Sequence, residues 1–376
     1  MTIEVLEGVQ LSDGERLRPF WQRSPVVLKQ AVDASALVPD PDTLRDILVH
    51  TALPARLITG QEGDRFTLQH GPFDHFDPPK GAWTVLLQAL EHIFPEYDAL
   101  RRDMAWLPSW RFEDCMLSWA SVGGSVGRHF DQFSVFLVQL NGRRQWEVGP
   151  VATQSTPLLA NQPLALVSPQ TPELTVTMAP GDVLYLPPHV IHHGVSLDPD
   201  CMTLSIGFRA PDAGQLLEAA LEHCDQSTQW LRYTDPQRSE RRGPAEITDD
   251  DLQCVEQLLR EFCNDRARLA SILASRVTLP YLEDPPESDL SEADAQALIQ
   301  GDGFFELDPG TRMAYFDDTI FINGEQIGDH APHALRQLAD SRVIDSQTIR
   351  DLDPRWHATL IALIVEGALQ PAEDSG

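Results

Sequence analysis

The first 210 residues consist of short apolar stretches separated by frequent proline and glycine. Several stretches recur every 8 to 20 residues, a spacing typical of strands in a β-sandwich or β-barrel. Seven candidate strands are CMLSWASV (115–122), FSVFLVQL (133–140), RRQWEVG (143–149), ELTVTMA (173–179), DVLYLPP (182–188), HHGVSL (192–197) and MTLSIGF (202–208). Ahead of them, TVLLQALEHIF carries leucine and isoleucine at helical spacing, which predicts a helix from Thr84 to Phe94.

From Pro211 onward the pattern becomes helical. Residues 211–224 and 247–277 each predict one helix, and Thr248 followed by acidic residues is a favourable helix start. The stretch DPQRSERRGPAEI between them indicates a loop, and TLPYLEDPPESDLSE (278–292) a linker. The second half is therefore expected to be mainly helical, whereas the first is expected to consist mainly of strands.

The segment after about Leu290 predicts a helix, a pair of strands and two more helices, the order of a winged helix. Residues 290–376 contain five arginines, no lysine and sixteen acidic residues, a net charge of −11. A winged helix that binds DNA should be basic. We therefore expect a module for protein contact or packing, without direct nucleic-acid binding.

Net charge and length narrow the class of protein. The 376 residues suit two or three domains, and 57 acidic against 28 basic residues give a net charge of −29. Such a chain should avoid nucleic acid and anionic membranes and favour a basic partner. Because Lys29 and Lys80 are its only lysines, a salt-adapted or GC-rich source explains the acidity equally well.

The cysteines and the N-terminus predict a cytoplasmic protein. The five cysteines form no CxxC pair, which favours buried thiols over disulfides or a zinc site. The chain begins without a basic and then apolar leader, and no apolar run approaches the roughly 18 residues of a membrane span.

The stretch VGRHFDQFSVF contains the first candidate site. If residues 125–140 form one strand, His129 and Asp131 share a face while Phe130 points the other way. An imidazole and a carboxylate side by side could occupy two adjacent positions on a metal. Taken alone, such a triplet more often consists of exposed polar side chains or of residues that form a structural hydrogen bond.

Two spacings strengthen the metal interpretation. Gly123 precedes His129 by six residues, and GDVLYLPPHVIHH places Gly181, Pro187 and His192 at Gly-x5-Pro-x4-His. The two halves resemble the paired motifs of the cupin superfamily, whose double-stranded β-helix brings both to one metal. Two histidines and one aspartate then form the facial triad of non-haem Fe(II) oxygenases.

The nearby histidines and one arginine extend this site. His189 and His193 are expected to be partly exposed polar residues, with His193 on the opposite face from His192. In NGRRQWEVG, alternation places Arg144 with Trp146 on the inward face, where its guanidinium could bind the distal carboxylate of 2-oxoglutarate. Pairing of Arg144 with a buried Asp or Glu is the alternative. Three hydroxyls on flanking strands could help to bind the same carboxylate, or could be polar strand residues without a role in binding. They belong to Ser118, Thr203 and Ser205.

Six stretches together resemble the bacterial ribosomal oxygenases of the JmjC class. They are FWQRSPVVLKQAV, HGPF, LPSWRFEDCMLSW, GGSVGRHFDQFSVFLVQLNGRRQWEVG, LYLPP and SIGFRAP, all within about residues 18–211. The resemblance implies a JmjC double-stranded β-helix with N-terminal extensions (1–210), a helical dimerisation segment with linker (211–285), a winged-helix-like domain (286–376) and a homodimer. The departure is PPHVIHH, since relatives tend to have glycine and proline before the ligand.

The resemblance also implies an activity: hydroxylation of an arginine in the sixteenth protein of the large ribosomal subunit, with Fe(II), 2-oxoglutarate and O₂. His129, Asp131 and His192 would hold Fe(II), and Arg144, Ser118 and Thr203 would contact 2-oxoglutarate. A basic ribosomal protein also suits the acidic chain. Two alternatives stay open: a JmjC hydroxylase or demethylase acting on histidine or lysine, and a non-catalytic cupin sensor joined to a winged helix.

Overall fold

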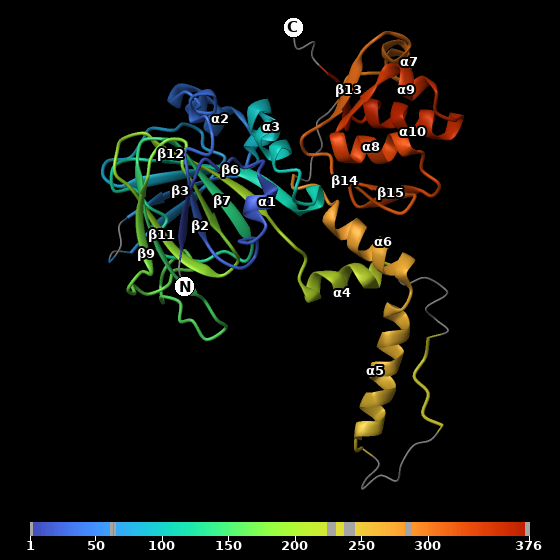
Figure 1. Ribbon diagram of the computed structural model, residues 1–376, viewed down its shortest axis with the longest axis horizontal. Helices are drawn as coiled ribbons and strands as arrows, with labels where there is room; N and C mark the ends of the chain where they lie inside the picture. Colours follow the sequence, from blue (N-terminus) through green and yellow to red (C-terminus); the bar gives the residue numbers. More distant parts are fainter. Residues whose placement is uncertain are drawn as a thin grey trace. The chain divides into compact units, whose positions relative to one another are not determined.

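The computed structural model describes residues 3–60, 63, 65–223, 231–236, 245–282 and 288–372. The chain divides into two compact units, residues 1–210 and 211–376 (Figure 1). The limits of the three expected domains, 1–210, 211–285 and 286–376, stay a prediction. In the described part of the chain, the helices are too short or too polar to cross a membrane.

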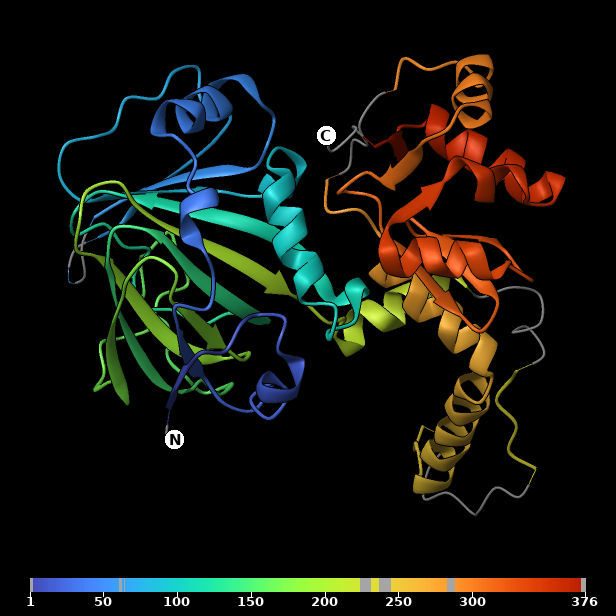
Figure 2. The ribbon, with the colours of Figure 1, turned by 45° about the horizontal axis from the view of Figure 1, so that its top comes forward.

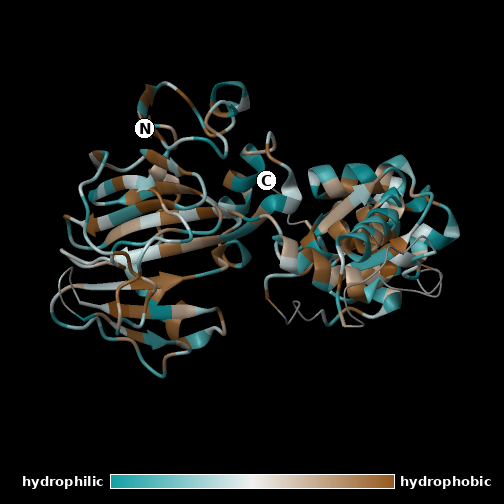
Figure 3. Cartoon of the chain, turned by 90° about the horizontal axis from the view of Figure 1, so that it is seen from below, coloured by the Kyte–Doolittle hydropathy of each residue, from teal (hydrophilic) through white to brown (hydrophobic). Residues whose placement is uncertain are grey.

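A nine-stranded sheet dominates the first unit, in the order β1-β2-β10-β7-β12-β6-β5-β3-β4. All seven predicted strands occur, as β6 to β12. The bounds in this sheet are β1 Glu4–Glu7, β2 Val26–Lys29, β3 Ala55–Thr59, β4 Thr67–His70, β5 Trp83–Leu87, β6 Phe112–Ala120, β7 Ser134–Asn141, β10 Val183–Leu186 and β12 Cys201–Phe208. Figure 3 shows the apolar residues recurring along the strands of this unit.

A second sheet has three strands in the order β11-β8-β9 and faces the first. Its strands are β8 Arg144–Val151, β9 Leu174–Met178 and β11 Val190–Ser196. One apolar cluster joins Trp146 and Val148 of β8 to Val135 and Leu137 of β7, so it fills the space between the sheets. The two facing sheets form the jelly roll, or double-stranded β-helix, that the motifs predicted.

The other face of the large sheet carries helices. They are α1 Gly14–Leu17, α2 Pro41–His50 and α3 Pro95–Asp103, with 3-10 turns η1 Ala34–Ala36, η2 Leu90–His92 and η3 Ser109–Arg111. Asp40 caps α2 and Pro41 starts it, as expected for a helix N-terminus. Figure 2 shows α2 lying over the strands of the large sheet. Leu44 and Leu48 of α2 pack in one core with Phe136 and Val138 of β7. Side chains of β7 therefore alternate between two cores.

The predicted helix from Thr84 to Phe94 is wrong. Residues 83–87 form strand β5 between β3 and β6, and the 3-10 turn η2 follows. All five residues of β5 are buried. A strand that is buried on both faces is a continuous apolar run, which periodicity does not distinguish from a buried helix.

The second unit begins with three helices, α4 Ala213–Glu222, α5 Asp249–Cys263 and α6 Arg266–Val277. The single helix predicted over 247–277 is thus two helices. The side chain of Asp265 accepts a hydrogen bond from the backbone N–H of Arg268 and so starts α6. Parts of the predicted loop at 235–247 and of the linker at 278–292 lie outside the described residues.

The remaining elements form the expected winged helix. They are α7 Glu292–Gln300, β13 Phe304–Leu307, β14 Met313–Phe316, β15 Thr319–Ile322, β16 Glu325–Gly328, α8 His333–Ser341, β17 Val343–Asp345, α9 Ser346–Arg350, α10 Pro354–Val365 and β18 Leu369–Pro371. The strands β14 to β16 form one sheet, and β13 pairs with both β17 and β18. Leu335 and Leu338 of α8 pack with Leu360 and Ile364 of α10 in this core.

Candidate metal centre

His129, Asp131 and His192 come together in the first unit, with their ligating atoms within 4.8 Å of one another. Oδ1 of Asp131 lies 4.0 Å from Nε2 of His129, and its Oδ2 lies 3.7 Å from Nε2 of His192. The expected strand over 125–140 is wrong, because β7 begins only at Ser134. Instead, His129 and His192 form an isolated antiparallel bridge, and each backbone N–H donates to the other's carbonyl at 3.0 and 2.8 Å.

Backbone carbonyls orient both imidazoles. Nδ1 of His129 lies 3.0 Å from the Gly127 oxygen, and Nδ1 of His192 lies 2.9 Å from the Val190 oxygen. A carbonyl only accepts, so Nδ1 carries a proton, and Nε2 of the neutral ring then presents its lone pair on the side of Asp131. Burial, together with the neighbouring His129, lowers the pKa of His192 to about 4. His192 is therefore neutral near pH 7, as a metal ligand must be.

The other two histidines lie outside this cluster. His189 is half-buried, and its backbone N–H donates to the backbone carbonyl oxygen of Asp131 at 2.7 Å. The expectation of partial exposure is wrong for His193, which is buried, with Nδ1 3.8 Å from Oε2 of Glu147. That carboxylate also binds Nη2 of Arg128 at 2.5 Å. The ion pair supplies the polar surroundings that a buried imidazole needs.

Arg144 lies on the inward face of β8, as the alternation predicted. Arg144, Trp146 and Val148 are buried, whereas Gln145 and Glu147 are partly exposed. Only 3% of Arg144 is exposed, yet its Nε and Nη2 have no hydrogen-bond partner in the described part of the chain. The alternative pairing with a buried carboxylate is not seen among the described residues. A buried guanidinium without a partner is costly, and an anion bound from outside would satisfy it.

Ser118 and Thr203 lie opposite each other on β6 and β12. The Ser118 hydroxyl is buried without a hydrogen-bond partner among the described residues. Thr203, in contrast, donates to Oε1 of Gln139 at 2.9 Å. The single donor of Thr203 is thus already used, and its predicted contact with 2-oxoglutarate stays a prediction.

Two polar residues in this unit had no signal in the sequence. Thr84 lies on β5, within the segment that the sequence incorrectly predicted to be a helix. Asp114 on β6 is buried, and burial, followed by the charge of Glu113, raises its pKa to about 6. Its Oδ1 and the ring of Phe133 both lie within 3.6 Å of where a Cβ on Gly207 would stand. Asp114 therefore lies near Phe133, the residue directly before β7. Asp131 precedes Phe133 by two residues.

The residues present fit an iron centre with an anionic cosubstrate. Two neutral imidazoles and one carboxylate are the donor set of non-haem Fe(II) sites, which leave open positions on the metal. The buried guanidinium of Arg144, whose Nε and Nη2 lack a partner in the described part of the chain, suits a carboxylate, which it can bind through two parallel hydrogen bonds.

Known families cover both units. Residues 99–216 match the family described as JmjC domain, and residues 256–370 match the ROXA-like winged helix. The chain is 31% identical over 359 residues to the ribosomal protein uL16 3-hydroxylase of Escherichia coli, and the aligned residues cover 93% of this chain and 95% of that protein. It is 29% identical over 357 residues to a probable ribosomal oxygenase of Haemophilus influenzae, with 89% and 88% covered.

Solved structures agree with these matches. The X-ray structure of YcfD from E. coli has a TM-score of 0.82 and 29% identity, and covers 95% of this chain and 97% of its own. The complex of that ribosomal oxygenase with cobalt and 2-oxoglutarate has a TM-score of 0.80 and 28% identity, with 96% and 98% covered. This chain therefore belongs to the JmjC-domain ribosomal oxygenases, which are dioxygenases that depend on Fe(II), 2-oxoglutarate and O₂.

Proposed function

We propose that this enzyme hydroxylates an arginine side chain of the large-subunit ribosomal protein uL16. The observation that carries the proposal is that one jelly roll contains both the His129–Asp131–His192 cluster and a buried Arg144 whose Nε and Nη2 have no partner among the described residues. We assign Fe(II) to the cluster and the distal carboxylate of 2-oxoglutarate to Arg144, with Ser118 and Thr203 as further contacts. The name of the E. coli relative supports the substrate.

When bound, the iron with 2-oxoglutarate and O₂ supplies an oxidant strong enough to hydroxylate an unactivated C–H bond. The protein's own task is positioning. The carbonyls of Gly127 and Val190 fix the orientation of the two imidazole rings, with Nε2 on the side of Asp131. Arg144 fixes one end of the cosubstrate. Trp146 forms an apolar wall beside His192, with the two ring centroids 5.8 Å apart. Such a wall keeps water from the reacting groups.

Asp114 supports an arginine as the target. A buried carboxylate whose pKa is about 6 is mostly ionised at neutral pH, and a guanidinium is its natural partner. The chain's net charge of −29 also favours approach of a basic ribosomal protein. On the same grounds we propose that the acidic winged helix contacts protein and not nucleic acid.

The substrate proposal is tested by mass spectrometry of peptides. We expect the enzyme, with Fe(II) and 2-oxoglutarate, to add one oxygen atom to an arginine of a uL16 peptide. Fragmentation should place the oxygen on that residue. A peptide with lysine at that position is the matched control and should stay unmodified, because an ammonium lacks the planar fork of a guanidinium.

The same assay separates the alternatives. Oxygen on a histidine, or loss of a methyl group from lysine, would replace the arginine assignment by another JmjC activity. Purified uL16 left unmodified, while another ribosomal protein gains oxygen, would overturn the choice of substrate but not the chemistry. The non-catalytic sensor is not favoured, because the curated relatives are named as a hydroxylase and an oxygenase.

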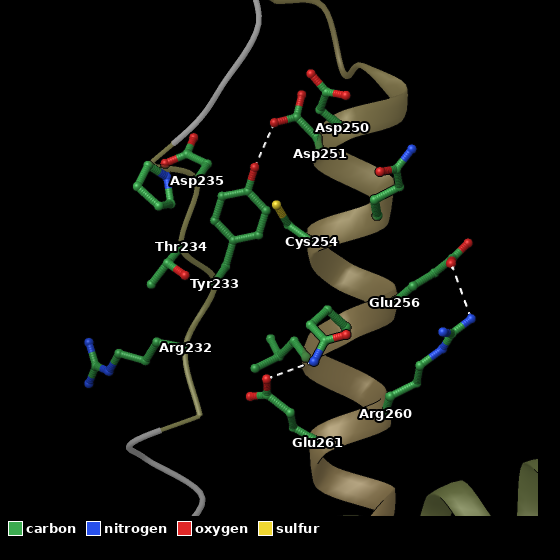
Figure 4. Close-up of a pocket in the computed structure, with 14 residues that line it drawn as sticks. Arg232, Tyr233, Thr234, Asp235, Asp250, Asp251, Cys254, Glu256, Arg260 and Glu261 are labelled. Carbon is green, nitrogen blue, oxygen red and sulfur yellow. Dashed lines mark hydrogen bonds and ion pairs between the residues drawn. The ribbon is translucent and has the colours of Figure 1, made fainter.

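We also propose that the enzyme is a homodimer that pairs through α5. Leu252, Val255 and Leu259 recur on one face of this helix, yet they are 53%, 42% and 57% exposed. They are not among the residues that line the groove in Figure 4, where Tyr233 donates to Asp251 at 2.6 Å. An exposed apolar stripe on an amphipathic helix suits a second copy of the chain.

Light scattering tests the dimer. The wild type should have about twice the 41.9 kDa of one chain, and Val255→Glu with Leu259→Glu should halve the mass, because charge is poorly tolerated in an apolar interface. Gln257→Glu adds charge at another position of the same helix and should leave the mass unchanged. A monomeric wild type would contradict the proposal.

A further inference from the structure

Thr84 is a fully buried threonine whose hydroxyl has no hydrogen-bond partner among the described residues. Leaving a buried hydroxyl unpaired costs about 1–3 kcal/mol. Valine has almost the same shape, is favoured in strands and would avoid this cost. A threonine in the middle of a buried strand therefore calls for a partner that binds from outside the chain.

Thr84 faces the interior of the jelly roll. Its neighbours Trp83 and Val85 pack in the helix-covered core, so alternation turns Thr84 the other way. The register pairs Thr84 with Ala120 and Leu86 with Ser118. Thr84 and Ser118 are therefore diagonal neighbours on one face of the sheet, at about 7–8 Å between Cα atoms. Both carry buried hydroxyls without partners in the described chain.

The loop at residues 121–124 connects this face to Arg144. The Ser121 N–H donates to the Trp83 oxygen at 3.1 Å, and the Ser196 N–H donates to the Gly124 oxygen at 3.0 Å. Ser196 is the register partner of Arg144 on β8. A Cβ on Gly124 would lie 2.2 Å from the Trp83 oxygen, so only glycine permits this approach. The backbones next to Thr84 and Arg144 are thus linked through one tight turn.

From this arrangement we infer that Thr84 donates a hydrogen bond to the distal carboxylate of 2-oxoglutarate, as a further contact beside Arg144 and Ser118. The inference rests on the proposed role of Arg144. A carboxylate accepts about four hydrogen bonds, and an arginine fork fills two of these sites. Two hydroxyls on the facing sheet supply the remaining donors. The carboxylate would thereby give one common partner to the hydroxyls of Thr84 and Ser118 and to the Nε and Nη2 atoms of Arg144, which have none among the described residues.

Calorimetric titration of 2-oxoglutarate into the full-length protein, with Mn(II) in place of Fe(II), tests the inference. Thr84→Val should weaken 2-oxoglutarate binding roughly tenfold or more, as for a lost hydrogen bond to a charged group. Thr84→Ser keeps the hydroxyl and should bind within about twofold of the wild type. Thr177→Val changes an exposed strand threonine and should have no effect.

Thermal unfolding of the same variants excludes a merely structural role. Thr84→Val should unfold at or above the wild-type temperature without ligand, yet gain less from added 2-oxoglutarate. Equal affinity in wild type and Thr84→Val, while Arg144→Met binds poorly, would overturn the role of Thr84 alone. Unchanged binding in Arg144→Met would overturn the proposed anion site itself, and with it the role of Thr84.

Discussion

Replacing His129 with alanine is expected to abolish hydroxylation and to remove tight metal binding. The three ligating side chains lie within 4.8 Å, and both imidazoles are already oriented by backbone carbonyls. Loss of a residue that only supports a metal ligand typically costs 10- to 100-fold in affinity or activity, so loss of a ligand should cost at least about 100-fold. Mn(II) binding and oxygen transfer to uL16 should be measured on the same preparation.

His70 supplies the matched control for this substitution. It is an exposed histidine at the end of β4, so His70→Ala removes an imidazole without touching the cluster. It should bind Mn(II) and hydroxylate like the wild type. Equal hydroxylation by His129→Ala and the wild type would show that the metal is held elsewhere.

Replacing Arg144 with methionine is expected to weaken 2-oxoglutarate binding by about 100- to 1000-fold without destabilising the free protein. Removing one partner of a buried charge pair costs about 3–5 kcal/mol, and under the proposed role of Arg144 the pair would form only when the cosubstrate is bound. Without ligand, methionine replaces a buried guanidinium whose Nε and Nη2 are unpaired in the described chain, so the unfolding temperature should stay equal or rise. Calorimetry and thermal unfolding measure the two effects.

The neighbouring arginine distinguishes charge from position. Arg143 is exposed, and its Nε donates to Oδ2 of Asp198 at 2.8 Å. Arg143→Met should keep the affinity for 2-oxoglutarate and lose only the small stability of a solvent-screened surface ion pair. A marked fall in the unfolding temperature of ligand-free Arg144→Met would mean that Arg144 stabilises the fold by itself.

Thr84 was absent from the predicted site because residues 83–87 form strand β5 and not the predicted helix. The stretch from Thr84 to Phe94 predicts a helix, and on a helix Thr84 would be an ordinary N-terminal polar residue. On β5 the same residue turns inward, diagonal to Ser118. The error arises because a central strand is apolar on both faces, so period two disappears.

The resemblance to the cupin motifs implied that the two motif halves meet at one metal. The sequence by itself determined the seven strands β6–β12 and the inward face of β8. These follow from local patterns, because alternation and glycine spacing are properties of neighbouring residues. Only the tertiary structure decided that Nε and Nη2 of Arg144 have no partner among the described residues, that Thr203 donates to Gln139 and that His193 is buried beside Glu147. Hydrogen-bond satisfaction depends on residues far apart in the chain, and only folding brings them within reach.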